Sequence, residues 1–139
     1  MFKHLKNETW KPFTFKGSDK LPLKYMVSNL GRVAAYTKSF ANDGELLKQT
    51  GADGVAKVTI RIKDESVRFM VHRAVAQVFV KPTSKSQKSV IHINHNKKDN
   101  KATNLKWASP KEVTEHNYNS EAMQGAFEKM AQRFIDAKK

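Results

Sequence analysis

The stretch from Val90 to Trp107 constrains the fold of this chain most, because it pairs two polar residues at a fixed spacing with a helix start directly behind them. His92 and Asn104 stand twelve residues apart, and Leu105 and Trp107 follow the asparagine. The segment from Ser109 to Glu112 matches a capping box, with serine at the N-cap, proline at the first helical position and glutamate at the third. The sequence therefore predicts a helix that begins at Ser109.

The net charge of the chain limits the classes of partner that we expect it to bind. The 139 residues include 26 Lys and Arg against 13 Asp and Glu, so the net charge is +13. Such a balance favours a polyanion such as nucleic acid, or an anionic membrane surface. The absence of cysteine excludes disulfides, cysteine zinc sites and a thiol nucleophile, and any metal must use His, Asn, Asp or Glu. No apolar run approaches the roughly 20 residues of a membrane span, which predicts an intracellular protein.

Local patterns predict strands in the first half of the chain and a short helix after them. Asn29-Leu30-Gly31 supplies turn chemistry between two apolar runs, which predicts a tight hairpin. Residues 55–62 alternate apolar and polar side chains in part, as a half-buried strand does. Residues 72–80 place apolar side chains at helical spacing, and residues 81–89 form a polar, basic loop with no apolar anchor.

The densest basic stretch runs from residue 81 to residue 111. It holds eight lysines against a single acid, Asp99. Lysine contacts to phosphates position a protein on a nucleic-acid backbone more than they read its bases. The expected phosphate-binding residues are Lys81, Lys85, Lys88, Lys97, Lys98, Lys101, Lys106 and Lys111.

Four short motifs in order make the chain similar to the phage and intron-associated homing endonucleases of the HNH group. They are Trp10-Lys11, the run from Tyr25 to Val33, Val71-His72-Arg73, and His92 with Asn104-Leu105-Lys106-Trp107. The resemblance covers roughly residues 8–118. It implies an α+β fold in which an antiparallel-strand module with a short helix (1–80) precedes a ββα-metal core (81–118). A C-terminal helix (119–139) completes a single compact unit.

The resemblance also implies roles for individual residues. His92 occupies the position of the general base, Asn104 that of the residue that orients it, and a divalent cation would stabilise the phosphorane. The ligand positions fall on Ile91 and Val113, and neither side chain offers the oxygen that a hard cation requires. We therefore expect no resident cofactor. Arg32 and Arg73, from the same motifs, join the lysines on the expected DNA surface.

Other ways to keep a metal remain open. A shifted register makes His95 the base with Asn94 before it, although Val113 still stands at the second ligand position. His116 and Asn117 lie on the same helix face as Val113, one turn along, and Glu112 is turned about 100° away. Contact with phosphate, or simple burial, is the preferred interpretation of these histidines.

The last segment predicts a helix over residues 120–137. Met123, Phe127, Met130 and Phe134 follow a spacing of four, three and four residues, which is typical of a two-heptad seam. This helix either folds back onto its own domain or forms a homodimer.

These features favour a protein that binds double-stranded DNA with its nuclease activity lost. We expect a regulator or a recombination or architectural accessory factor, encoded by a phage or mobile element and found in the cytoplasm of a bacterial host. The alternative is an active HNH nicking endonuclease that uses Mg²⁺ or another divalent cation. A third possibility is a scaffold that binds another protein.

Overall fold

We describe the chain from a computed structural model, for residues 2–15, 18–51, 54–62 and 65–137. The fold mixes antiparallel strands with helices, as the sequence predicts. A four-stranded sheet comes first, in the order β1-β2-β3-β4. Its strands are β1 (Trp10–Phe13), β2 (Lys24–Ser28), β3 (Val33–Tyr36) and β4 (Glu45–Leu46), with the short helices η1 (Ser18–Lys20) and α1 (Phe40–Asp43) in the connections.

The predicted hairpin at residues 29–31 is confirmed as the connection between β2 and β3. Gly31 adopts a φ of +91°, a conformation that glycine reaches without strain. The hydroxyl of Ser28 accepts the backbone N–H groups of Leu30 at 3.2 Å and of Arg32 at 3.1 Å. We call residues 28–32 the β2–β3 turn.

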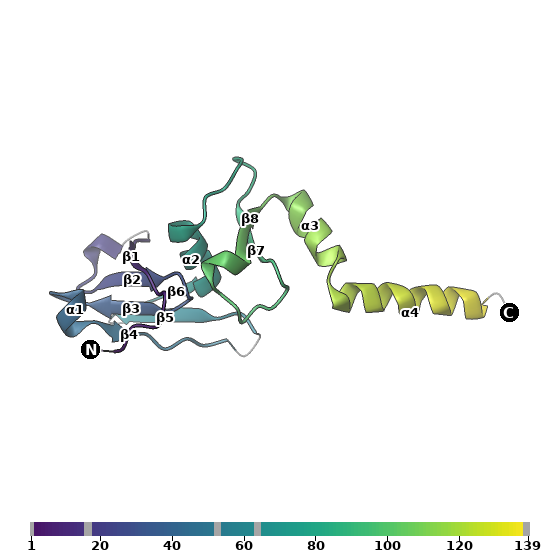
Figure 1. The fold of residues 1–139 in the computed structure, drawn as a ribbon. Helices are drawn as coiled ribbons and strands as arrows, with labels where there is room; N and C mark the ends of the chain where they lie inside the picture. Colours follow the sequence, from purple (N-terminus) through teal and green to yellow (C-terminus); the bar gives the residue numbers. More distant parts are fainter. Residues whose placement is uncertain (1, 16–17, 52–53, 63–64, 138–139) are drawn as a thin grey trace.

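A second antiparallel pair leads into the central helix. β5 (Lys57–Ile62) pairs with β6 (Glu65–Met70), which confirms the predicted strand. Helix α2 (Val71–Phe79) follows at once and buries Val71, Ala74, Val75 and Ala76. It lies between the N-terminal strands and the hairpin that follows, and it contacts β1, β2, β6, β7 and β8 (Figure 1).

The predicted ββα unit is present around His92. β7 (Ser89–His92) pairs with β8 (Leu105–Ala108), the short helix η2 (Ala102–Asn104) precedes β8, and α3 (Pro110–Tyr118) follows it. The capping box of α3 is formed, since Ser109 Oγ accepts the Glu112 N–H at 3.2 Å and the Glu112 carboxylate accepts the Ser109 N–H at 3.1 Å.

One apolar core joins the N-terminal strands to this unit. The buried cluster extends from Phe13 and Tyr25 through α2 to Leu105 of β8. The Trp107 indole adds a polar link, because its Nε1 donates to the Val80 carbonyl at 2.8 Å. β8 therefore rests on the C-terminal end of α2.

Helix α4 (Glu121–Ala137) extends away from the rest of the molecule (Figure 1). Within the described part of the chain, α4 packs mainly against α3. In the structure this helix therefore extends from α3 and does not fold back across the strands (Figure 1). Among the helices that the structure describes, none combines the length and the apolar character needed to cross a membrane.

Candidate functional site around His92

His92 ends β7 with its ring largely buried, at 8% exposure. Its Nε2 lies 2.7 Å from Asn100 Oδ1. Because an amide oxygen only accepts, Nε2 carries the proton, and Nδ1 keeps the lone pair. The ring is thus held in the tautomer that can take a proton through Nδ1.

The asparagine that orients His92 is Asn100, and the expectation that Asn104 does so is corrected. Both amide hydrogens of Asn104 are used elsewhere, on Asn94 Oδ1 and on the Asp99 carbonyl, each at 2.9 Å. Its oxygen accepts the Asn94 N–H at 3.0 Å. Asn104 therefore holds the loop between β7 and β8 in shape and acts on the ring only through that loop.

His72 of α2 is a second imidazole beside His92. The two ring centroids lie 5.0 Å apart. His72 Nδ1 is buried without a hydrogen-bond partner among the described residues. Burial, together with the charges of His92 and Arg73, lowers the pKa of His72 to about 4. His72 is therefore neutral near pH 7.

The two expected ligand positions carry side chains that cannot bind a cation. Ile91 alternates with His92 along β7 and pairs with Lys106, so both lie on the face toward α3. Lys106 Nζ lies 3.5 Å from Glu112 of α3, which agrees with that placement. Val113 is half-buried on the same helix.

Glu112, which precedes Val113 on α3, has structural partners. Besides capping the helix, it accepts from Gln87 Nε2 at 3.0 Å. The hydrogen bond from Gln87, those from Ser109 and the charge of Lys106 lower the pKa of Glu112 to about 2. Glu112 is therefore ionised and occupied by these partners.

His116 and His95, close to the hairpin, are engaged as well. His116 Nε2 donates to the His92 carbonyl oxygen at 2.7 Å. The ring of His95 stacks on that of His116, with centroids 3.8 Å apart and an angle of 11° between the planes. Lone pairs of parallel rings lie in parallel planes and do not converge on one ion. Burial, followed by the charges of His95, His92 and Lys106, lowers the pKa of His116, against a raising contribution from the His92 carbonyl.

The donor set therefore does not fit a divalent metal. Within the described residues, no group of three or more His, Cys, Asp or Glu side chains is arranged to hold one. The shifted register gains nothing, because His95 sits in an exposed turn with a φ of +64° and Asn94 is bonded to Asn104 and Asp99.

A basic surface surrounds the hairpin. All eight lysines between residues 81 and 111 are exposed, and so is Arg73. The loop after α2 is anchored, which its sequence does not indicate: buried Gln87 accepts the N–H groups of Thr83 at 2.6 Å and Ser84 at 3.2 Å. The link from Gln87 to Glu112 then fixes this loop to α3.

Arg32 does not belong to that surface, and its assignment as a DNA contact is corrected. Its guanidinium forms an ion pair with the buried Glu8 carboxylate and donates to the Lys3 carbonyl at 2.9 Å. It also lies over the rings of Phe2 and Trp10. Burial alone would raise the pKa of Glu8. The Arg32 hydrogen bonds and charge, together with hydrogen bonds from the Leu5 N–H and Ser28, outweigh burial and lower that pKa to about 2. Arg32 fastens the N-terminal segment to the sheet.

The predicted seam on α4 is described only in part. Phe127 packs against Tyr118 with ring centroids 4.7 Å apart, and Met130 is 63% exposed. The side chains of Met123 and Phe134 lie outside the described residues.

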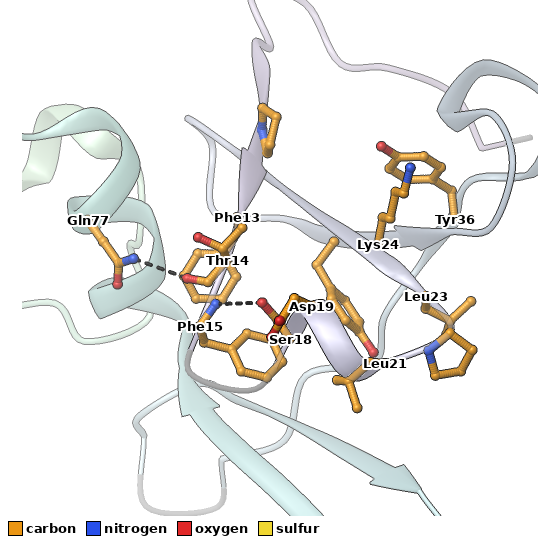
Figure 2. Close-up of a pocket in the computed structure, with 13 residues that line it drawn as sticks. Phe13, Thr14, Phe15, Ser18, Asp19, Leu21, Leu23, Lys24, Tyr36 and Gln77 are labelled. Atoms are coloured by element: carbon orange, nitrogen blue, oxygen red, sulfur yellow. Dashed lines mark hydrogen bonds between the residues drawn. The ribbon is translucent and has the colours of Figure 1, made fainter.

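A hollow of about 830 Å³ lies between β1, β2, η1 and α2 (Figure 2). Phe13, Phe15 and Leu21 line it. Gln77 donates to the Thr14 carbonyl at 3.2 Å, and the Phe15 N–H donates to Ser18 Oγ at 3.1 Å. None of its lining residues belongs to the His92 cluster.

Comparison with known proteins places this geometry among HNH endonucleases. Residues 8–61 match the NUMOD4 motif. Two uncharacterized HNH endonucleases of Acanthamoeba polyphaga mimivirus are 36% identical over 113 residues and 31% identical over 110 residues, covering 80% and 76% of this chain. They are covered over only 26% and 32% of their own lengths, so the chain spans about a quarter to a third of these relatives.

A solved structure matches as well. The HNH homing endonuclease I-HmuI, described as binding and cleaving DNA, superposes with a TM-score of 0.58 at 29% identity. The match covers 83% of this chain and 60% of that one.

Proposed function

The chain belongs to the HNH endonuclease family, and from that premise we propose that it binds double-stranded DNA without cleaving it by the one-metal mechanism. The observation that carries the proposal is the pairing of an intact basic surface with two aliphatic residues, Ile91 and Val113, where cation ligands are needed. Such a protein would act as a regulator or as a recombination or architectural accessory factor of a virus or mobile element.

DNA binding is supported by the charge around the hairpin. Eight exposed lysines and Arg73 stand against Asp99, which is half-buried and bonded to Asn94. Lysines that neutralise phosphates release counterions, so affinity falls with salt at a log–log slope of about −0.9 per phosphate. A steep salt dependence is therefore expected.

The loss of cutting is supported by the chemistry of the donors. Cleavage of this type needs a cation to stabilise the charge that develops on the phosphate and the leaving oxygen. Ile91 and Val113 supply no ligand, and the nearby Glu112 and His116 are already bonded within the protein. His92 and Asn100 then serve as a preserved structural pair.

Supercoiled plasmid with Mg²⁺ or Mn²⁺ tests this proposal directly. We expect binding in a gel-shift assay over a salt series and no nicking above the level of a His92→Ala control. Nicking that disappears in this control would overturn the loss of activity. No DNA affinity at low salt would overturn the DNA-binding role and leave the protein-binding alternative.

One observation favours the second candidate, an active nicking endonuclease. His92 is held in the tautomer whose Nδ1 can accept a proton, as a general base requires. If DNA or parts of a longer protein supply substitute ligands for the cation, His92 can act as the general base. Cleavage dependent on both His92 and an added cation would support this candidate.

A homodimer through α4 is a further part of the proposal. The helix contacts mainly α3, and Met130 and Ile135 are 63% and 53% exposed. Sedimentation of the full chain over a concentration series should show a dimer that Met130→Lys separates. A monomer at all concentrations would remove this part and leave DNA binding untouched.

A further inference from the structure

We propose that the β2–β3 turn of the N-terminal module positions the His92 imidazole, acting through Asn100. The turn lies some seventy residues before Asn100 in the sequence, yet two contacts join the two segments.

The first contact is a backbone hydrogen bond. The Ala102 N–H donates to the Asn29 carbonyl at 2.8 Å. Ala102 begins η2, two residues after Asn100, so this bond fixes the chain directly behind the asparagine.

The second contact is a close approach that a side chain at Gly31 would disturb. A Cβ placed on Gly31 would lie 3.1 Å from both the Cβ and the carbonyl oxygen of Asn100. The backbone of Asn100 therefore rests on Gly31, and its side chain points on to His92 Nε2 at 2.7 Å. Asn100 is 6% exposed, so solvent does not hold it in place.

The turn is itself held firmly from behind. Asn29 and Thr9 exchange two hydrogen bonds, Thr9 N–H to Asn29 Oδ1 at 2.7 Å and Asn29 N–H to the Thr9 carbonyl at 3.0 Å. Gln49 Nε2 donates to the Gly31 carbonyl at 2.8 Å. Ser28 is fully buried and bonds inside the turn. These bonds hold the turn in place, and the turn can therefore fix the position of Asn100 and, through it, the His92 ring.

These contacts make Gly31 and Asn29 positioning residues. They touch neither a nucleic acid nor the imidazole, and they act by fixing the place of Asn100 and hence the proton on His92 Nε2. The inference depends on the proposed function only for the use made of the ring. The N-terminal strands and the ββα unit would then act together to position the His92 ring.

The test is the Nε2-bound proton of His92, followed by NMR on the isotope-labelled full chain without DNA or metal. Asn100→Ala should abolish its protected resonance, and Asn100→Asp, which keeps an accepting oxygen, should retain it. Gly31→Ala should abolish the resonance or speed its exchange with water roughly tenfold or more.

The chain offers a matched control for the backbone strain. Gly54 has a φ of +89°, close to the +91° of Gly31, but a Cβ there would meet nothing within 4 Å. Gly54→Ala therefore adds similar strain without pressing on Asn100, and it should leave the His92 proton unchanged. An unchanged proton in folded Gly31→Ala, or an equal change in Gly54→Ala, would overturn the proposal.

A second variant decides the matter if Gly31→Ala fails to fold. Ala102→Pro removes the N–H that bonds Asn29 at the first position of η2, where proline is tolerated, and Lys101 already has the extended φ of −65° and ψ of 141° that proline requires before it. Loss of the protected proton supports the proposal, and its retention overturns it. Because no DNA is present, a failure of DNA binding is a separate outcome.

Discussion

The two faces of β7 differ in what they keep of a nuclease site. On the face toward α2, His92 is bonded to Asn100 and lies beside His72, and the β2–β3 turn supports it. On the face toward α3, the ligand position holds Ile91, and the side chains around it bond to one another. Proton-handling geometry is thus built into the core of the fold, whereas cation binding depends on individual side chains at its edge.

This difference means that the two functions can be lost separately. Ile91 and Val113 stand at the two ligand positions and lie outside the buried cluster. Aliphatic residues at these positions therefore leave the shared core from Phe13 to Leu105 undisturbed. Disturbing Asn100 or Gly31 would affect both the hairpin and the N-terminal sheet. Under the proposed function, a scaffold of this kind would lose its metal at little cost in stability and keep its exposed lysines.

The largest expected effect comes from restoring the missing ligands on the face of β7 toward α3, which tests the difference between the two faces. Ile91→Asp combined with Val113→Asn returns oxygen donors to both positions beside an intact His92. We expect Mg²⁺-dependent nicking of supercoiled plasmid on the order of 10²-fold above the wild-type level, since base and cation would then act together.

The control for this gain is His92→Ala in the same double variant, which should return nicking to the wild-type level. Equal nicking by the wild-type chain would mean that cation binding was never lost. If calorimetry shows that the double variant binds Mg²⁺ but nicking does not increase, the loss of activity lies in His92 and not in the missing ligands.

The next largest effect concerns the basic surface. Replacing Lys97, Lys98 and Lys101 by alanine removes three exposed charges beside the hairpin. DNA affinity near physiological salt should fall roughly tenfold or more, and the log–log salt slope should flatten by about 0.9 per lost phosphate contact. Fluorescence anisotropy over a salt series measures both quantities.

A charge-matched control separates this surface from net charge. Lys6, Lys20 and Lys48 are also exposed, but they lie in the N-terminal part of the chain. Their triple alanine variant should bind more tightly than the hairpin variant. Equal losses in the two variants would show that only overall charge matters.

The sequence predicted the elements whose signals are local. The β2–β3 turn, α2 and the α3 capping box depend on neighbouring residues, and each appears as expected. The roles of Asn100 and Arg32 were missed for a different reason. Asn100 and Asn104 are the same residue type in one loop, and only the path of the loop decides which reaches His92. Arg32 finds Glu8 at a separation of 24 residues, which no local pattern reveals.

The His72 ring gives a smaller effect, on stability against acid. The pKa of His72 is about 4 in the folded chain and near 6.5 when unfolded, so the unfolded state binds more protons between these values. Stability should therefore fall as the pH drops from about 6.5 toward 4. After discounting for partial exposure, we expect ~1–2 kcal/mol, measured by urea unfolding.

His72→Gln serves as the comparison, because it removes the His72 imidazole and should reduce the slope between pH 6.5 and 5. His116, whose pKa is also lowered, remains in the variant and keeps a smaller slope in the same direction. The pKa values of Glu8 and Glu112 fall on folding from 4.5 to about 2, so their contribution to stability is lost mainly below about pH 4.5, under that window. An equal slope in the variant would mean that another group causes the acid loss.

The smallest effect tests the face toward α3. Ser109→Ala removes the hydroxyl that accepts the Glu112 N–H, and should cost ~1 kcal/mol of unfolding free energy. If that face is only structural, DNA affinity and the protected His92 proton should both survive at temperatures where the variant is folded. Ser109→Thr keeps a capping hydroxyl and should recover most of the stability. A loss of the His92 proton in Ser109→Ala would show that the two faces of β7 are coupled, since His116 of α3 donates to the His92 carbonyl.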